Sequence, residues 1–331
     1  MAIYDFGFYI SSQGANIGSN SGIIMRPRSS INPTDFTTFI FTNAGSTGRE
    51  GPTLASCLTA YDTSSNSWLN EPTSFNVVNG IQYWTVPSTG TYAITAAGAQ
   101  GGTNTGRPEC KGAIIAGTFS LTAGDIIRIL VGQAGQAAAS PGTNFYGSGG
   151  GGTFVMKNPY NSTASSLVIA GGGAGINFRS PDMPHTAAPG SKTTVPGNAS
   201  GAEATNGGGG GSTGNNGGNA TNGTGVGSGG WAGGGGGLLG NGGSSTGGAG
   251  GGFAFINGGR GGLGYSTGQV GGFGGGGGSG AAGAGGGGYN GGNSGDNSSS
   301  GGGGGSYNSG SNQYALSGAN SGHGFVTIAL L

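Results

Sequence analysis

"GGFGGGGGSGAAGAGGGG", residues 271–288, contains almost no side chain that could be buried in an apolar core. Glycine makes up 88 of the 331 residues of the chain and half of residues 201–310. A flexible linker is the simplest interpretation, because ordering a glycine costs more backbone entropy than ordering any other residue. However, long structureless linkers are uncommon inside compact domains, and this segment also carries large side chains such as Phe253, Phe255 and Phe273. The segment is therefore predicted to be ordered.

Hydrogen bonds between main chains can order such a segment without an apolar core. Collagen is excluded because glycine does not recur at every third position; instead, runs of five glycines occur at 207–211, 233–237, 274–278 and 301–305. A polyproline II chain has three residues per turn and no internal hydrogen bonds, so its N–H and C=O groups point outward. Where the outward positions are glycine, neighbouring chains can approach and bond to one another, each bond contributing about 0.5–1.5 kcal/mol. We expect a bundle of polyglycine II helices.

The remainder of the chain has the pattern of an all-β protein. Short β-branched and aromatic runs alternate with glycine-bearing turns in FTTFIFT (36–42), GIQYWTVPSTGTYAITAAGA (80–99), GAIIAGTFSLTAGDIIRILVGQAG (112–135), GGTFVMK (151–157) and SLVIAGGG (166–173). This pattern predicts an antiparallel sandwich, and the family resemblance described below implies that it is of the jelly-roll kind. One exception is GPTLASCLTAY (51–61), where apolar residues at helical spacing predict a short α-helix near 52–61, with Pro52 in its first turn.

The final segment GHGFVTIALL (322–331) determines how the two halves are connected. Its residues are typical of a β-strand, and the nearest sheet that this strand could join is formed by residues before 180. We therefore expect the glycine-rich part to be an insertion within one domain. The predicted organisation is an N-terminal arm (1–36), a β-sandwich (37–180 plus 318–331) and a glycine-rich insertion (181–317).

Composition excludes several classes of function. Charged residues make up 6% of the chain and the formal net charge is zero, so no basic face is available for nucleic acid. No run reaches the roughly 18 apolar residues that membrane insertion requires, and the N-terminus lacks a secretory signal pattern. Cys57 and Cys110 allow either one disulfide or two buried thiols.

Catalytic chemistry is also poorly represented. His185 and His323 are the only histidines, and His323 precedes the final strand, where we expect a structural role. Glu203 and Asp296 are the only acidic residues between 201 and 310, and nothing in the sequence brings them together. No cluster of metal ligands or complete phosphate-binding loop is present, so we expect no enzymatic activity, no cofactor and no metal.

Seven motifs, taken in order, resemble a known family. They are FTNAGSTGREGPTLASCLTAY (41–61), GIQYWTVPSTGTYAITAAGAQGG (80–102), GTFSLTAGDIIRILVGQAGQ (117–136), GGGGTFVMK (149–157), LVIAGGGAG (167–175), GGGGYNGG (285–292) and GHGFVTI (322–328). The chain resembles the glycine-rich extracellular domain of the anaplastic lymphoma kinase and leukocyte tyrosine kinase receptors. This resemblance implies a sandwich similar to tumour necrosis factor, with polyglycine helices inserted before its last strand. Ala44 stands where the first cysteine of the family is expected, which leaves Cys57 without that partner. The glycine half is also similar in composition to polyglycine adhesins of phage tail fibres.

These observations lead to a functional hypothesis. A module of extracellular type without a secretion signal is typical of a virion protein, so we expect a fibre or tail adhesin on the virion surface that has no catalytic activity. The expected partners are other virion proteins, a host cell-surface receptor or glycan, and further copies in a homotrimer. The alternative is a cell-surface or secreted ligand-binding module, with an extracellular location. A polysaccharide-cleaving enzyme is a third and weaker alternative.

Two groups of residues are the candidates for binding. An extended arm containing Pro27 is predicted to dock onto the particle through Ile23, Ile24, Met25, Arg26 and Arg28. Loops at 212–226, 238–249, 253–270, 289–300 and 306–321 are expected to face the host, with receptor-binding candidates Trp231, Leu238, Leu239, Tyr265, Tyr289 and Tyr307. The phenylalanines of the insertion are expected to seal the ends of glycine helices. For the three tyrosines, such a sealing role and an exposed stacking platform remain equally open.

Overall fold

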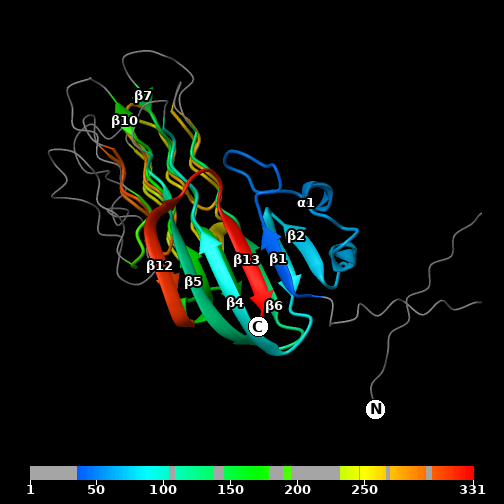
Figure 1. Ribbon diagram of the computed structural model, residues 1–331. Coiled ribbons are helices and arrows are strands. Elements are labelled where there is room, and N and C mark those ends of the chain that lie inside the picture. The colour runs from blue at the N-terminus through cyan, green and yellow to red at the C-terminus, as the bar shows by residue number, and fades with distance from the viewer. Residues whose placement is uncertain are drawn as a thin grey trace, which may run out of the picture. The chain divides into compact units, whose positions relative to one another are not determined.

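The computed structural model describes residues 36–103, 109–136, 145–178, 189–194, 232–245, 247–265, 269–295 and 300–331. Two antiparallel sheets dominate it (Figure 1). The first sheet has the order β1 (Thr38–Phe41), β13 (Phe325–Leu330), β4 (Gly90–Ala97), β5 (Gly112–Leu121) and β12 (Ser311–Asn320). The second has the order β11 (Tyr307–Asn308), β9 (Ser166–Ala170), β8 (Thr153–Lys157), β6 (Ile126–Leu130), β3 (Ile81–Thr85) and β2 (Phe75–Val78). A separate pair joins β7 (Phe145–Tyr146) to β10 (Asn177–Phe178). The predicted all-β sandwich is confirmed.

Aromatic side chains fill the space between the two sheets. In β4, alternate residues are buried, which places Tyr92 and Ile94 in the core as the sequence predicts. Tyr92 of the first sheet meets Trp84 of the second edge to face, with 5.8 Å between the ring centroids. Phe36, at the end of the expected arm, is also buried, and its ring lies 5.0 Å from that of Trp84. Phe36, the first described residue, therefore belongs to the apolar core.

The predicted helix is present in a slightly shorter form. α1 (Leu54–Ala60) begins at the N-cap Thr53, whose hydroxyl accepts a hydrogen bond from the Ser56 N–H while the Ser56 hydroxyl caps the Thr53 N–H. Pro52 lies before the cap rather than in the first turn, so its expected position is wrong by one or two residues. Three 3₁₀ turns, η2 (Ser67–Asn70), η3 (Thr163–Ser165) and η5 (Phe255–Asn257), were not predicted.

The last strands close the sandwich around the insertion. β13 lies between β1 and β4, so the expectation that the C-terminal strand joins a sheet formed before residue 180 is confirmed. β12 pairs with β5 and forms an edge of the same sheet. The loop expected over 306–321 is therefore wrong for residues 311–320. The sequence SNQYALSGAN does not alternate clearly between apolar and polar residues, because most of this edge strand faces solvent.

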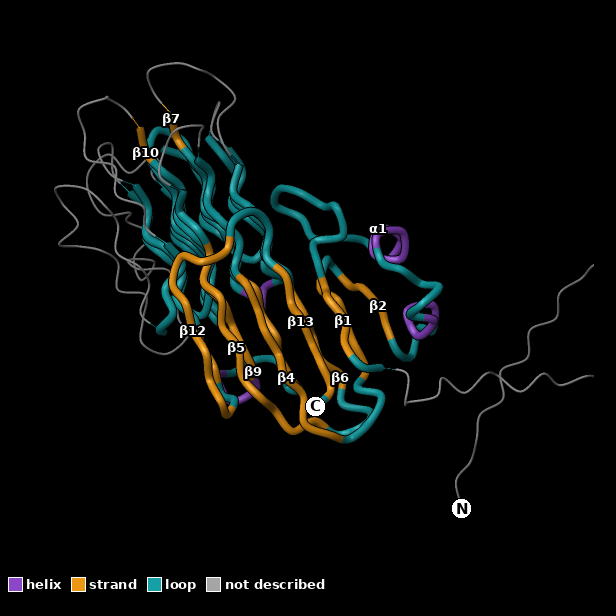
Figure 2. Tube along the Cα trace, viewed as in Figure 1, coloured by secondary structure: helices purple, strands orange, loops and turns teal. Residues whose placement is uncertain are grey.

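Glycine segments continue directly from the sheet strands, as the parallel loop traces in Figure 2 show. Strands β4, β6 and β9 lead into residues 98–102, 131–136 and 171–175, and residues 147–152 lead into β8. These extensions bond to segments of the insertion: the Gly149 N–H donates to the Gly277 carbonyl (2.9 Å), and the Gly172 N–H donates to the Gly287 carbonyl (2.8 Å). The glycine bundle is thus built from both parts of the chain, which the predicted division into sandwich and insertion does not anticipate.

The hydrogen bonds of one glycine segment repeat every third residue. Successive N–H groups of residues 233–235 donate to three different segments, and those of residues 236–238 return to the same three segments in the same order. The acceptors in turn are the carbonyls of Gly278, Gly243, Gly292, Gly275, Gly240 and Tyr289, at 2.7–3.0 Å. A polyproline II chain has this threefold repeat, whereas a β-strand has a repeat of two. The repeat supports the polyglycine II assignment, which stays a prediction.

Close approach between main chains leaves no space for a Cβ atom at many glycines of this bundle. A Cβ atom added to Gly235 would lie 2.0 Å from the carbonyl oxygen of Gly286, which belongs to the backbone. Its neighbour Gly234 differs, since a Cβ atom there would meet nothing nearer than the Gly243 nitrogen, at 3.4 Å. Two adjacent glycines in the same run therefore differ sharply in the space around them.

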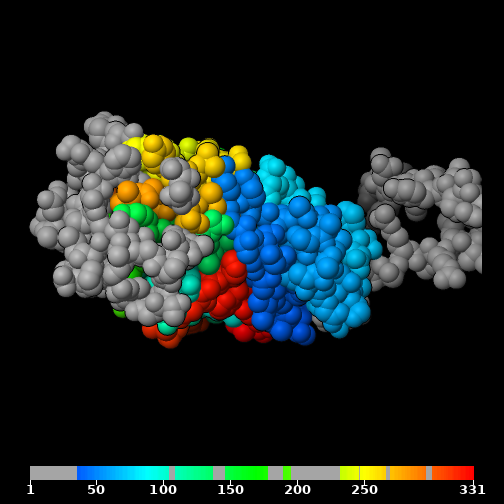
Figure 3. All heavy atoms as spheres, turned by 90° about the horizontal axis from the view of Figure 1, so that it is seen from above, coloured from blue at the N-terminus to red at the C-terminus, as the bar shows by residue number. Residues whose placement is uncertain are grey.

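Arg49 and Glu50, in the segment before α1, contact the glycine-rich insertion. The side chain of Arg260 donates to the Glu50 carboxylate, with 2.8 Å between Arg260 Nε and Glu50 Oε1. Arg49 and Gly261 exchange a pair of bonds, because Arg49 Nε donates to the Gly261 carbonyl and the Gly261 N–H donates to the Arg49 carbonyl, both at 2.9 Å. Figure 3 shows these parts of the chain, in blue and yellow, lying against each other.

His323 has the structural role that its position predicts. Its Nδ1 accepts a hydrogen bond from the Ala134 N–H (3.1 Å), and its carbonyl accepts one from Asn320 Nδ2 (2.9 Å). Burial lowers the pKa of His323 below its usual 6.5, because a charged imidazole would lose its hydration. The Ala134 bond also requires an unprotonated Nδ1.

The steric difference between Gly234 and Gly235 can be measured. We expect Gly235→Ala to reduce the free energy of unfolding by about 1–3 kcal/mol, because the methyl group must displace backbone in a closely packed region. Gly234→Ala is the matched control and should change stability by less than about 1 kcal/mol. Urea unfolding of both variants measures the difference. Equal stability of the two variants would contradict the close packing around Gly235.

Protonation of His323 should destabilise the fold at mildly acidic pH. Since the folded pKa lies below the unfolded value, the unfolded chain binds the proton first, and stability is lost as pH falls through 6.5. The melting temperature should decline between about pH 7.5 and pH 5. His323→Gln should flatten that decline within the same range. A decline of the same size in the variant would show that another group is responsible.

Candidate functional site

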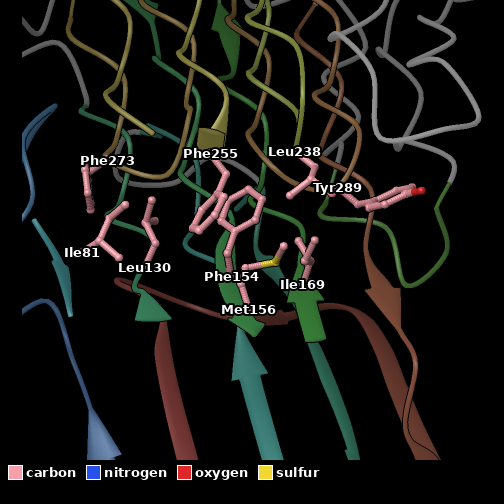
Figure 4. Packing of buried hydrophobic residues seen from close by; sticks show 9 residues of the cluster. All are labelled: Ile81, Leu130, Phe154, Met156, Ile169, Leu238, Phe255, Phe273 and Tyr289. Carbon is pink, nitrogen blue, oxygen red and sulfur yellow. The ribbon is translucent and has the colours of Figure 1, made fainter. Parts of the chain in front are cut away.

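An apolar cluster joins the glycine bundle to the second sheet. Side chains from β3, β6, β8 and β9 meet side chains from the insertion, and the cluster consists of Ile81, Leu130, Phe154, Met156, Ile169, Leu238, Phe255, Phe273 and Tyr289 (Figure 4). Phe154 and Phe255 stack with 5.2 Å between their ring centroids. We call this set the junction cluster. It makes the position of the bundle dependent on the sheet beneath it.

Several of the predicted binding residues belong to the junction cluster. Phe255 and Phe273 are buried beside glycine segments, which supports the expected sealing role, and that role stays a prediction. Leu238 is fully buried and Tyr289 is 3% exposed, which corrects their expected role as exposed receptor contacts. Leu239 packs against the same cluster and is partly buried.

The other two tyrosine candidates, Tyr307 and Tyr265, differ in their surroundings. Tyr289 stacks on Tyr307 with 5.0 Å between the centroids, and the hydroxyls of Tyr289 and Thr163 lie 2.9 Å apart. Tyr307 is partly buried in β11. Tyr265 alone among the described candidates has a large exposed fraction, 44%. Trp231 and the arm residues Ile23, Ile24, Met25, Arg26 and Arg28 lie outside the described residues.

A pocket opens beside the junction cluster. It has a volume of about 380 Å³, within the usual range for small-molecule sites, and its walls come from the β2–β3 turn, β6, the segment after β8 and η5. Ile81 and Phe255 belong to both the pocket and the cluster, so they form a fixed apolar floor. Val78 and Ile256, which also line the pocket, remain 44% and 45% exposed. The pocket therefore exists only where sandwich and insertion meet.

Arg128 is the one charged residue that lines this pocket. Its guanidinium carbon lies 3.9 Å from the centroid of the Tyr160 ring and 4.9 Å from that of Tyr83, and both rings line the pocket too. These distances are typical of cation–π contacts, which hold a guanidinium without neutralising it. Neither ion pair among the described residues involves Arg128, and its buried Nε has no hydrogen-bond partner. The pocket thus contains a positive charge with no counter-ion.

Polar groups around Arg128 complete the pocket. The Tyr160 hydroxyl donates to the Ile126 carbonyl (2.8 Å), which fixes the ring, and burial raises the pKa of Tyr160. Tyr160 is therefore neutral at neutral pH. The exposed side chains of Asn79 and Asn161 line the pocket, and no described residue bonds to their amide groups. Such amides offer both donors and acceptors to a ligand.

The sequence analysis missed this site. Arg128 stands in the apolar run IIRIL, where Ile127 and Ile129 are buried between the sheets and Arg128 lies on the opposite face. A lone charge within a strand was the available signal. It could not be interpreted because an outward-facing arginine is ordinarily exposed to solvent, whereas here the segment after β8 and η5 of the insertion cover that face.

Neither cysteine provides reactive chemistry. Both are buried, and no disulfide joins Cys57 to Cys110, so the alternative of two buried thiols is the one that the structure supports. Burial raises the pKa of Cys57 to about 12, which keeps its thiol protonated. Within the described ranges, no group of three or more His, Cys, Asp or Glu side chains could hold a metal ion. None of the described helices has the length and apolar character needed to cross a membrane.

Comparison with known proteins finds a partial relative. The chain is 36% identical over 107 residues to the leukocyte tyrosine kinase receptor of Mus musculus. This match covers 32% of the chain and 12% of the receptor, so the similarity is confined to a small part of that relative. No family model matches the chain. The finding supports a distant relationship to this receptor.

The junction cluster should account for much of the stability. Phe273→Ala removes a fully buried ring and should lower the free energy of unfolding by about 3–5 kcal/mol, because the backbone around it cannot collapse into the cavity. Leu263→Ala, at a position that is 53% exposed, is the control and should cost no more than about 0.5 kcal/mol. Chemical unfolding measures both values. A small effect of Phe273→Ala would mean that the bundle is held without this cluster.

Proposed function

We propose that this chain is a non-enzymatic attachment protein on the outside of a particle, such as a fibre or tail adhesin of a virion. The observation that carries this proposal is the pocket at the junction, where Arg128 has no counter-ion and side chains from both halves form the walls. A binding surface of this kind needs a rigid support. Main-chain hydrogen bonds between glycine segments supply that support without a large apolar core.

The composition of the pocket favours binding over cleavage. Glycoside hydrolysis ordinarily requires two carboxyl groups about 5–10 Å apart, and no acidic residue lines the pocket around Arg128. Its polar atoms come from Arg128, the two tyrosines and the asparagine amides, which can recognise a ligand but supply no general acid–base pair. A receptor or glycan on a host surface is the proposed ligand.

A second candidate function rests on the receptor similarity. The partial match to the leukocyte tyrosine kinase receptor favours a cell-surface or secreted ligand-binding module with an extracellular location. Under either proposal the sandwich and bundle act as a passive scaffold. Docking onto other virion proteins through residues 1–36 and assembly into a homotrimer belong only to the first proposal.

Imaging of purified particles distinguishes the two candidates. An antibody raised against the glycine-rich insertion should label the surface of intact particles if the chain is a virion attachment protein. Removal of residues 1–35, which spares the buried Phe36, should then abolish incorporation while the remaining domain still folds. Absence of label from every particle would contradict the first proposal. Label on the surface of producing cells, or secreted protein, would favour the second.

A further inference from the structure

We propose that the pocket around Arg128 binds the carboxylate of an acidic sugar, such as a uronic or sialic acid unit of a glycan. This inference rests on the proposed attachment function and specifies the ligand class of that site. The relevant feature is the unneutralised charge of Arg128. The guanidinium lies over the rings of Tyr83 and Tyr160, and neither ion pair among the described residues includes it. A ligand anion that binds this cation would supply its missing counter-charge.

The guanidinium of Arg128 is held in a restricted orientation that suits binding of a planar anion. Contact with the rings of Tyr83 and Tyr160 limits the orientations of the guanidinium, so little side-chain entropy remains to be lost on binding. The Nε atom is shielded from solvent, whereas Arg128 as a whole is only partly buried, so the terminal NH₂ groups are those available to a ligand. A carboxylate matches two such donors in one plane.

No acid among the described residues forms an ion pair with Arg128. Asp125 is one acid whose charge reaches this region, since it acts on the hydroxyl of Tyr160. Its carboxylate accepts a hydrogen bond from the Thr122 N–H (2.9 Å) and forms no salt bridge with Arg128. A ligand carboxylate would therefore not have to displace an existing ion pair.

The rest of the pocket matches a sugar ring better than a peptide chain. Asn79 and Asn161 place amide groups at the mouth, where hydroxyl groups around a carboxylate would find both donors and acceptors. Pro159 and Ile256 provide apolar surface for the C–H face of a ring. A pocket of about 380 Å³ has room for a single compact unit such as one sugar ring.

Binding can be measured by calorimetry or ligand-observed NMR with the full chain produced in bacteria. Glucuronate and N-acetylneuraminate are the acidic probes, glucose is the neutral probe, and a glutamate-containing peptide tests the other source of a carboxylate. For a ligand of this size we expect a Kd on the order of 1 mM for at least one acidic sugar, and much weaker binding of glucose. The Nε–H signal of Arg128 should shift on binding, which a purely structural arginine would not show.

Variants test the role of Arg128 directly. Arg128→Gln should weaken binding of the acidic sugar by about 10- to 100-fold, and Arg128→Lys should retain only part of the affinity, because lysine keeps the charge but loses the planar pair of donors. Arg260→Gln is the matched control, since it removes an exposed arginine that does not line the pocket, and it should leave affinity unchanged. Tyr160→Phe keeps the ring over the guanidinium and should also bind.

Defined results would overturn this inference. They are equal binding of glucose and glucuronate, unchanged affinity of a folded Arg128→Gln variant, preference for the acidic peptide, or no binding of either acidic sugar at tenfold above the expected Kd, about 10 mM. Attachment of the chain to host cells that persists in Arg128→Gln would also overturn it while leaving the proposed attachment function intact. Absence of the chain from particles would instead affect only the proposed location.

Discussion

Hydrogen bonding between glycine main chains is the constraint on which the remainder of this structure depends. Each segment of the bundle bonds to several neighbours, and the partners of residues 233–238 recur every third residue. Each bond is weak in net terms, but the bonds are dense and mutually supporting. The same closeness explains the composition: at Gly235 even one methyl group would overlap the backbone of a neighbour. The close packing of the main chains therefore requires the high glycine content of this part of the protein.

The apolar interior of this bundle is small, with a buried cluster of Ala232, Ala282 and Ala284, so the bundle needs another source of anchoring. The junction cluster provides it, because Leu238, Phe255, Phe273 and Tyr289 insert against the second sheet. Their burial adds the hydrophobic stabilisation that the glycine segments themselves lack. The sheet strands also run on into glycine segments, so the main chain is continuous across the boundary. Sandwich and bundle therefore share one folding unit.

The pocket is a consequence of this junction. An arginine on the outer face of a sheet would normally extend into solvent, but here η5 and the segment after β8 enclose it. Two tyrosines then hold the cation in place without neutralising it. A binding site on such a base would vary little in shape, since both of its walls belong to rigid elements. The proposed attachment function rests on this arrangement.

The amino-acid sequence by itself determined the β-sandwich, the short helix and the return of the last strand. Each of these follows from local patterns, namely alternation in β4, helical spacing before Tyr61 and the strand chemistry of residues 322–331. Strand β12 escaped prediction because an exposed edge strand lacks alternation. The burial of Leu238 and Tyr289, and the enclosure of Arg128, were decided only by the tertiary structure. The physical reason is that all three depend on which segments meet at the junction, and glycine runs of nearly identical composition carry no local signal that specifies their neighbours.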